Sequence, residues 1–396
     1  MGMHTNSVLQ LDKSRLAGFF LLLLLQACTD VTARAENLNL QQAKRAEQRG
    51  LSLQATGLYQ QAAQQGEVAA LQPLLRLQRP QIGYQQFELW LQQTPFNQAQ
   101  LQPVLAAMGR WQQLPVVVAS DYQRRWQTPA LTLPDCALRI QPVVSTQISA
   151  QTWSTLRQQW SADRQLSTLN LCFLPPVFVD RASLSCSEQI EKRIDCQLTP
   201  LQQLILQHQP TQILLLSGTG LASFNNGIIQ LPETASLALL RHELSHLFEF
   251  LDEYPLAAAV AKTECQVGRI TPNLLFSKAD LASYLTAWQL AAEQVTLTAV
   301  DTCVQAGKQA YRVVSADSHL QHYELAMPEL YLQLMQKQLQ QPAQLMPVAY
   351  YFAYLARQRQ DWSNWTQMMQ LAAASGYPPA QAALAEARTG QNNTAR

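Results

Sequence analysis

Short apolar runs and longer amphipathic stretches alternate along this chain and predict an α+β fold. Residues 36–110 repeat apolar and small side chains at helical spacing, and a similar pattern returns near the C-terminus. Between these regions, residues 138–144, 169–174 and 213–218 are short apolar runs rich in strand-forming side chains. The pattern therefore predicts a mixed sheet with a helical segment before it and another after it.

The region that follows these strands predicts one more strand and then a helix. Residues 222–231 predict a strand after an Asn-Gly turn signal. Pro232-Glu233-Thr234 predict the start of the helix, because proline and acidic residues are favoured in a first turn. Over 234–251, four leucines form a buried stripe on this helix, at positions 240, 244, 247 and 251.

The N-terminus predicts an exported, lipid-anchored protein. Lys13 and Arg15 accompany an apolar core over residues 16–25, which is too short to span a bilayer. The core ends at Leu25-Gln26-Ala27-Cys28, which resembles a bacterial lipobox. The resemblance implies cleavage before Cys28, a diacylglycerol anchor on its thiol and, from the Thr29 that follows, the outer membrane. An ordinary secretory signal with an incidental cysteine is the alternative.

The six cysteines after Cys28 indicate how the chain is cross-linked, and the overall charge limits which partners it can bind. Six cysteines in an exported chain predict up to three disulfides, and Cys186 and Cys196 are the first expected pair because they bracket a short segment. A cysteine-bound metal is the weaker alternative, because the chain has no Cys-x-x-Cys. A net charge of +1 with only 14% charged residues argues against a nucleic-acid partner.

The segment His242-Glu243-Leu244-Ser245-His246 predicts a zinc site. Residues four apart share one face of a helix, so the two imidazoles can bind one Zn²⁺. Glu243 would then lie beside the open coordination position and act as general base on zinc-bound water. Two packed histidines bonded to the backbone are the alternative. A catalytic zinc ion usually takes three protein ligands, so a third is expected downstream.

Residues 242–254 resemble metzincin-like zinc metallopeptidases that read His-Glu-x-x-His-x-x-Gly-x-x-Asp-Glu-Tyr, notably the immune inhibitor A-type and IgA-peptidase-like families. The resemblance implies that Asp252 is the third ligand. Glu249 replaces the family glycine, and a left-handed turn without glycine is strained. The helix would then run further, until Tyr254 and Pro255, and bring Glu253 to the metal. A more distant residue such as Glu264 is the third candidate.

Residues 317–323 are similar to the Ser-x-Met turn that lies under the metal in these peptidases, with Leu320 in the position of the methionine. The resemblance implies that Tyr323 donates a hydrogen bond to the developing oxyanion. A polar loop before a helix that begins near Pro328 is the alternative. His319 and His322 also leave open a metal ligand from outside the helix.

Residues 58–71 and 365–384 resemble Sel1-type helical repeats, whose small residues let paired helices pack closely. One unit at each end is not a solenoid, since about three are needed for a stable stack. Amphipathic helices that cap the central domain are the alternative.

Together these features predict a signal peptide (1–27), a helical Sel1-like segment (28–110), a zincin-like metallopeptidase domain (111–345) and a C-terminal helical Sel1-like segment (346–396). The expected function is a zinc-dependent endopeptidase that hydrolyses protein or peptide substrates in the bacterial envelope, on its periplasmic or surface face. One alternative is a non-catalytic envelope scaffold lipoprotein whose Sel1-like helices bind an envelope protein. A zinc hydrolase that acts on cell-wall peptide is another.

Overall fold

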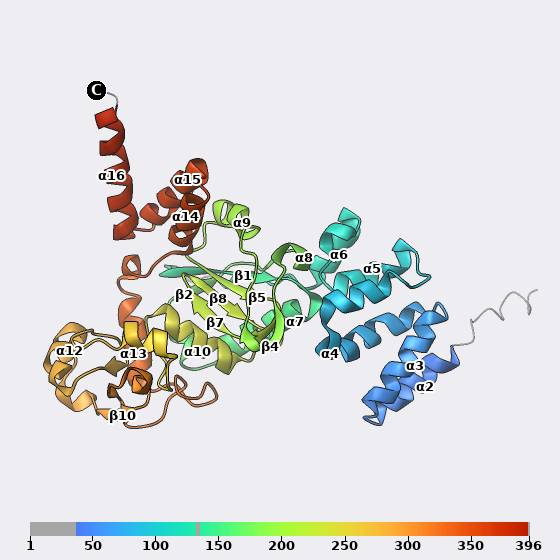
Figure 1. Ribbon diagram of the computed structural model, residues 1–396, viewed down its shortest axis with the longest axis horizontal. Coiled ribbons are helices and arrows are strands. Elements are labelled where there is room, and N and C mark those ends of the chain that lie inside the picture. The colour runs from blue at the N-terminus through green and yellow to red at the C-terminus, as the bar shows by residue number, and fades with distance from the viewer. Residues whose placement is uncertain (1–36, 132–134, 395–396) are drawn as a thin grey trace, which may run out of the picture. The chain divides into compact units, whose positions relative to one another are not determined.

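The computed structural model describes residues 37–131 and 135–394 and shows a mixed α+β fold (Figure 1). Helices come first, and a mostly parallel sheet with flanking helices follows, as the sequence predicts. The chain divides into two compact units between Leu101 and Gln102. The predicted signal peptide and Cys28 lie outside the described residues.

The described part of the first unit consists of helices, as expected for this region: α2 (Leu38–Gln48), α3 (Ser52–Gln64), α4 (Leu71–Leu91) and the start of α5 (Gln98–Ala107). Asn37 begins α2, because its side chain accepts hydrogen bonds from the backbone amides of Asn39 and Leu40. Helices α2 and α3 are in contact, and five of their alanines are buried, namely Ala43, Ala46, Ala55, Ala62 and Ala63. Such small side chains allow the two helices to pack closely.

The second unit is built on a six-stranded sheet: β1 (Leu138–Val144), β2 (Leu171–Phe173), β3 (Val177–Phe178), β5 (Gln212–Leu216), β7 (Ser223–Asn225) and β8 (Ile228–Leu231). The strand order is β2-β1-β5-β8-β7, and β3 also pairs with β1. All pairs are parallel except β7 with β8. The buried central strands explain the continuous apolar runs in the sequence, because both faces of a parallel sheet are covered.

Residues 222–231 form a hairpin rather than the single strand expected from the sequence. Asn226 and Gly227 have φ values of 50° and 84°, as a two-residue type I′ turn requires. The turn reverses the chain, so β8 pairs with β5 inside the sheet and β7 becomes its antiparallel edge. The strand directly before the histidine helix is therefore an interior strand, and the edge strand comes one step earlier.

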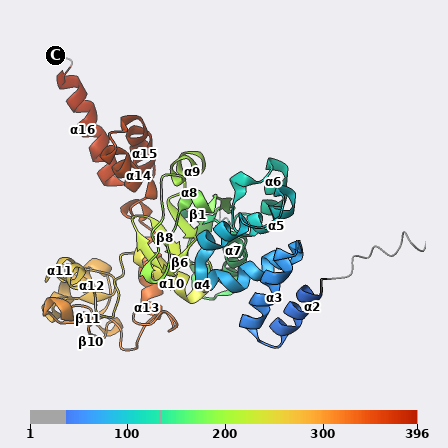
Figure 2. The same cartoon turned by 45° about the vertical axis from the view of Figure 1, so that its right-hand side comes forward.

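Two cores lie on opposite faces of the sheet (Figures 1 and 2). One face packs against α7 (Gln147–Ala162), α10 (Leu237–Leu247) and α13 (Glu329–Gln338). The other packs against α9 (Leu201–His208), α14 (Val348–Gln358) and α15 (Trp362–Ala374), and α16 (Pro378–Thr394) follows. Neighbouring strand residues alternate between the cores: Leu214 and Leu216 face the first, and Ile213 and Leu215 the second.

The remaining elements are short. Helix α6 (Val116–Arg125) precedes β1 in the chain, and helix α8 (Arg181–Leu184) follows β3. Strand β4 (Glu188–Arg193) pairs with β6 (Thr219–Leu221). A separate antiparallel sheet, β10-β11-β9, comes from β9 (Leu274–Leu275), β10 (Thr298–Val300) and β11 (Ala310–Arg312). α11 (Ala258–Glu264) and α12 (Leu281–Trp288) belong to the same part of the chain.

In the described part of the chain, three disulfides join the six cysteines that follow Cys28, in the pairs Cys136–Cys172, Cys186–Cys196 and Cys265–Cys303. The expected pairing of Cys186 with Cys196 is confirmed. Disulfides form and persist in oxidising compartments, so they point to a location outside the cytoplasm. Within the described ranges, none of the helices has the length and apolar character needed to cross a membrane.

Candidate metal centre

Helix α10 carries both histidines of the sequence motif, but it is shorter than expected. It begins at Leu237 rather than at Pro232, because the side chain of Ser236 caps it by accepting a hydrogen bond from the amide of Leu239. It ends at Leu247. Three of the predicted leucines, at positions 240, 244 and 247, are buried against the sheet. This packing fixes the rotation of the helix about its axis.

The chain turns back sharply at Glu249, which adopts a left-handed backbone conformation with φ of 61°. This is the conformation that the family glycine would take, and for a residue with a Cβ it costs roughly 1–2 kcal/mol. The expectation that a glutamate here would prolong the helix is therefore wrong. Because the chain reverses at this point, Asp252 returns to the histidines instead of continuing away from them.

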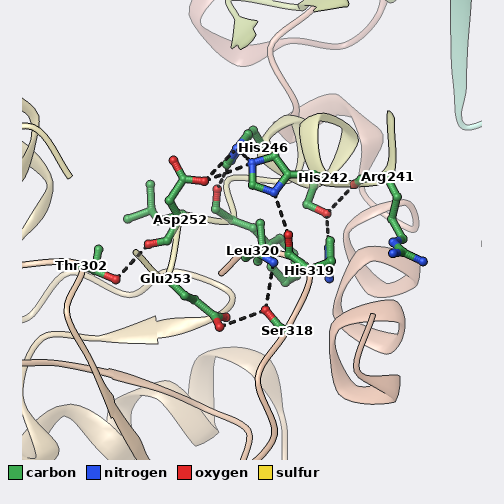
Figure 3. Close-up of polar contacts among 12 residues, drawn as sticks. Arg241, His242, His246, Asp252, Glu253, Thr302, Ser318, His319 and Leu320 are labelled. Carbon is green, nitrogen blue, oxygen red and sulfur yellow. Dashed lines mark hydrogen bonds and ion pairs between the residues drawn. The ribbon is translucent and has the colours of Figure 1, made fainter. Parts of the chain in front are cut away.

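His242, His246 and Asp252 converge on one point (Figure 3). The two Nε2 atoms are 3.3 Å apart, and Oδ1 of Asp252 lies 3.2 Å from Nε2 of His242 and 3.3 Å from Nε2 of His246. Around a tetrahedral zinc ion with bonds of about 2.0–2.1 Å, ligand atoms are about 3.3–3.4 Å apart. The triangle thus has nearly the size of one face of such a tetrahedron.

Backbone carbonyls orient both imidazoles. Nδ1 of His242 lies 2.7 Å from the carbonyl oxygen of His319, and Nδ1 of His246 lies 2.8 Å from that of Phe250. A carbonyl oxygen can only accept a hydrogen bond, so in each ring Nδ1 carries the proton and donates it. The Nε2 lone pair of each ring is then available to bind a metal ion. This is the tautomer that a metal-ligating histidine needs.

The three converging atoms are all acceptors, and this sets the charge of the site. With both rings neutral, neither Nε2 carries a hydrogen, and Oδ1 of Asp252 is buried without a hydrogen-bond donor. Burial would lower the pKa of His246, but Asp252 outweighs it and raises that pKa to about 9. Burial would raise the pKa of Asp252, yet the two histidines hold it well below its usual value. The group therefore attracts either a proton or a metal cation.

Glu243 is buried beside this group, with 5% of its surface exposed. Burial raises the pKa of its carboxyl above the usual range, and the neighbouring His246 and His242 partly oppose the shift. Asp252 adds to the increase. The carboxyl therefore lies next to the three converging atoms without being one of them.

The other candidates for third ligand have different partners. Glu253 is 1% exposed and accepts hydrogen bonds from the hydroxyls of Tyr331 and Ser318, at 2.6 and 2.9 Å. Glu264 forms an ion pair with Arg269. Neither carboxylate belongs to the converging group.

The turn over residues 318–320, which the sequence resemblance singled out, contacts the His242-His246-Asp252 group through His242 (Figure 3). Its central residue, His319, supplies the carbonyl that orients His242, and its Nε2 lies 2.7 Å from the hydroxyl of Ser245. Burial and the charge of Arg241 lower the pKa of His319 to about 2, so the ring is neutral. His319 therefore acts here through its backbone, whereas His322 is exposed.

The structure does not bring Tyr323 into this group. Its side chain is 41% exposed, and its hydroxyl has Glu324 as hydrogen-bond partner. Tyr254 lies there instead: its ring stacks nearly parallel to that of His242, with centroids 6.5 Å apart, and its hydroxyl bonds Asp252. In the sequence, Tyr254 directly follows Asp252 and Glu253. We interpreted Tyr254 only as the end of the helix, although this position indicated a place near the site.

No protein-family model matches this chain, and no curated protein is detectably similar to it. The local geometry therefore defines what the site is: a His-His-Asp group that could hold a metal ion, with a buried glutamate next to it.

Proposed function

We propose that this protein is a zinc-dependent endopeptidase whose metal ligands are His242, His246 and Asp252. The observation that carries the proposal is the convergence of three acceptor atoms within 3.3 Å of one another, beside a buried carboxyl. Three protein ligands leave one position of a tetrahedral ion open, which is typical of catalytic rather than structural zinc. A zincin-like peptidase domain fits this site and the sheet that supports α10.

Glu243 is the general base in this proposal. A bound zinc ion lowers the pKa of water and polarises a carbonyl oxygen. Glu243 takes a proton from the attacking water and returns it to the amine that leaves. Its raised pKa supports this role, because a carboxyl that titrates closer to neutral pH both accepts and returns a proton efficiently.

A tyrosine is the expected hydrogen-bond donor to the developing oxyanion. We assigned this role to Tyr323 from the sequence, but the contacts of Tyr254 support Tyr254 better. Burial, reinforced by the charge of Asp252, raises the pKa of Tyr254, so its hydroxyl keeps the proton that it would donate.

An extended protein or peptide substrate fits the edge of the sheet. Within residues 37–131 and 135–394, strand β7 pairs with β8 on one side only, and it packs against α10, which carries the histidines. Its open side offers main-chain donors and acceptors to a peptide. We therefore place the substrate along β7, with its scissile bond at the metal group.

The expected setting is the bacterial envelope. The disulfides agree with an oxidising compartment, while the Cys28 anchor and the outer-membrane location rest on the sequence. The helical segments over 28–110 and 346–396 contain the Sel1-like stretches, and these stretches would bind an envelope protein partner.

The proposal is tested by zinc analysis of the protein without residues 1–28, together with cleavage of a diverse peptide library. We expect one zinc ion per chain and cleavage that stops when the metal is chelated. The Glu243→Gln variant should keep its zinc and lose cleavage, whereas Glu249→Gln, an exposed control beside the motif, should keep both. Proteolysis that survives Glu243→Gln would contradict the proposal. Zinc that only maintains the fold, without cleavage, would favour the scaffold alternative.

A further inference from the structure

Glu253 follows the third ligand directly, yet its carboxylate points away from the metal group into the protein (Figure 3). It is 1% exposed. A buried carboxylate costs stability unless partners compensate for the lost water. Oε1 accepts hydrogen bonds from Tyr331 at 2.6 Å and from the side-chain amide of Asn273 at 3.3 Å, and Oε2 accepts one from Ser318 at 2.9 Å.

The first connection to the metal group runs through the backbone of the loop. The amide of Glu253 donates to the carbonyl of Leu320 at 3.0 Å, and the preceding carbonyl, that of Asp252, accepts from the hydroxyl of Thr302 at 2.9 Å. Asn273 holds the same loop on the other side, with hydrogen bonds to both the amide and the carbonyl of Leu251. The carboxylate ligand is thus fixed by the residues on either side of it.

The second connection runs through the turn over residues 318–320. The Ser318 hydroxyl that donates to Glu253 also accepts from the amide of Leu320, at 3.0 Å. These bonds close the turn around the carbonyl of His319, which orients His242 through a 2.7 Å hydrogen bond. Glu253 therefore belongs to the loop that carries Asp252, and its carboxylate binds the turn that orients His242.

We infer that Glu253 is a positioning residue that sets the spacing between Asp252 and His242, and through it the affinity for the metal. This inference rests on the proposed zinc site. Groups that orient metal ligands typically change metal affinity by 10–100-fold when they are removed. Glu253 is built into the loop and the turn at the same time, so we expect an effect in this range.

Three variants separate this role from a general contribution to folding. Glu253→Gln keeps the shape of the side chain but removes its charge and one acceptor oxygen. Ser318→Ala breaks the connection to the turn and leaves the carboxylate in place. Tyr331→Phe is the matched control, because it removes a hydrogen bond to the same carboxylate and leaves the bond to Ser318 intact. It also keeps the ring, which contacts Phe250 of the loop and His319 of the turn.

The measurements are zinc affinity by competition with a chromogenic chelator, the visible absorption spectrum of the Co²⁺-loaded protein, and thermal unfolding of the metal-free protein. We expect Glu253→Gln and Ser318→Ala to bind zinc about 10–100-fold more weakly, with altered Co²⁺ spectra. Tyr331→Phe should lower the unfolding temperature and keep the wild-type affinity and spectrum.

Wild-type affinity and spectra in both Glu253→Gln and Ser318→Ala would overturn the inference. So would losses of affinity in all three variants that follow the loss of metal-free stability. If Glu253→Gln does not fold, the zinc affinity and Co²⁺ spectrum of Ser318→Ala decide whether the inference holds. A wild-type protein that binds no zinc overturns the proposed function and this inference with it, whereas unchanged variants of a zinc-binding wild type overturn the inference alone.

Discussion

Nδ1 of His242 donates a hydrogen bond to the backbone carbonyl of His319, which is 77 residues further along the chain and 2.7 Å away. This bond fixes the tautomer of His242 and connects α10 to the turn over residues 318–320. The metal group therefore depends on contacts between distant parts of the second unit as well as on the motif within one helix.

Loss of the Asp252 carboxylate should abolish tight zinc binding. Asp252→Ala leaves two imidazoles, and removing a direct ligand should weaken zinc binding by more than the roughly 100-fold that loss of an orienting group can cost. Zinc content after dialysis and competition with a chelator measure this. The exposed Asp301→Asn is the control and should bind zinc normally. An Asp252→Ala protein with wild-type affinity would show that another residue completes the site.

The stability of the metal-free protein should fall as the pH rises from about 6.5 to about 9. The pKa of His246 is raised to about 9 in the fold, so protonation favours the folded state. This contribution is fully present below the unfolded pKa of about 6.5, is lost through pH 9, and is on the order of 3 kcal/mol. Urea unfolding with a chelator present, at pH 6 and pH 9, measures it.

Zinc reverses this pH dependence, because the metal must displace the proton from the histidine. With zinc in excess, the protein should be stabilised more strongly at pH 9 than at pH 6. His246→Gln is the control, since it removes the titrating group and should flatten the metal-free profile. Metal-free stability that increases from pH 6 to pH 9 would refute the assignment of this proton to His246 and Asp252.

Glu249→Gly should stabilise the protein slightly. The residue is exposed and its φ is 61°, so glycine removes strain of roughly 1 kcal/mol without the loss of a buried contact. Glu249→Val should be destabilising, because a β-branched side chain fits this conformation worst. Thermal unfolding of both variants tests the prediction. Gln370→Gly, at an exposed position inside α15, is the control and should cost about 1 kcal/mol.

Removal of the Tyr254 hydroxyl should slow peptide hydrolysis, whereas removal of the Tyr323 hydroxyl should leave the rate nearly unchanged. Tyr254→Phe should lower kcat by about 10²–10³-fold, as loss of an oxyanion donor does elsewhere. Tyr323→Phe should be nearly silent, because that hydroxyl interacts with Glu324. Steady-state kinetics on a peptide cleaved by the wild type measure both, and zinc content shows that the metal is retained. The reverse pattern would return the role to Tyr323.

Local patterns in the sequence predicted the elements and the two histidines. The spacing of His242 and His246 places them one helical turn apart whatever surrounds the helix. Likewise, the strand expected over residues 138–144 is β1, because a run of buried strand formers has few other structures available. The pairing of Cys186 with Cys196 followed from their proximity in the chain. Each of these features depends on residues close together in sequence.

The tertiary structure decided which carboxylate lies beside the two histidines. Asp252 and Glu253 are adjacent and chemically alike, and the sequence left both open. The left-handed turn at Glu249 sends Asp252 to the histidines, while Ser318 and Tyr331 bind the carboxylate of Glu253. Those partners lie 65 and 78 residues away. Local sequence preferences are the same whether Asp252 or Glu253 faces the histidines. Tertiary packing therefore decides between these two adjacent residues, because it brings the distant partners into contact.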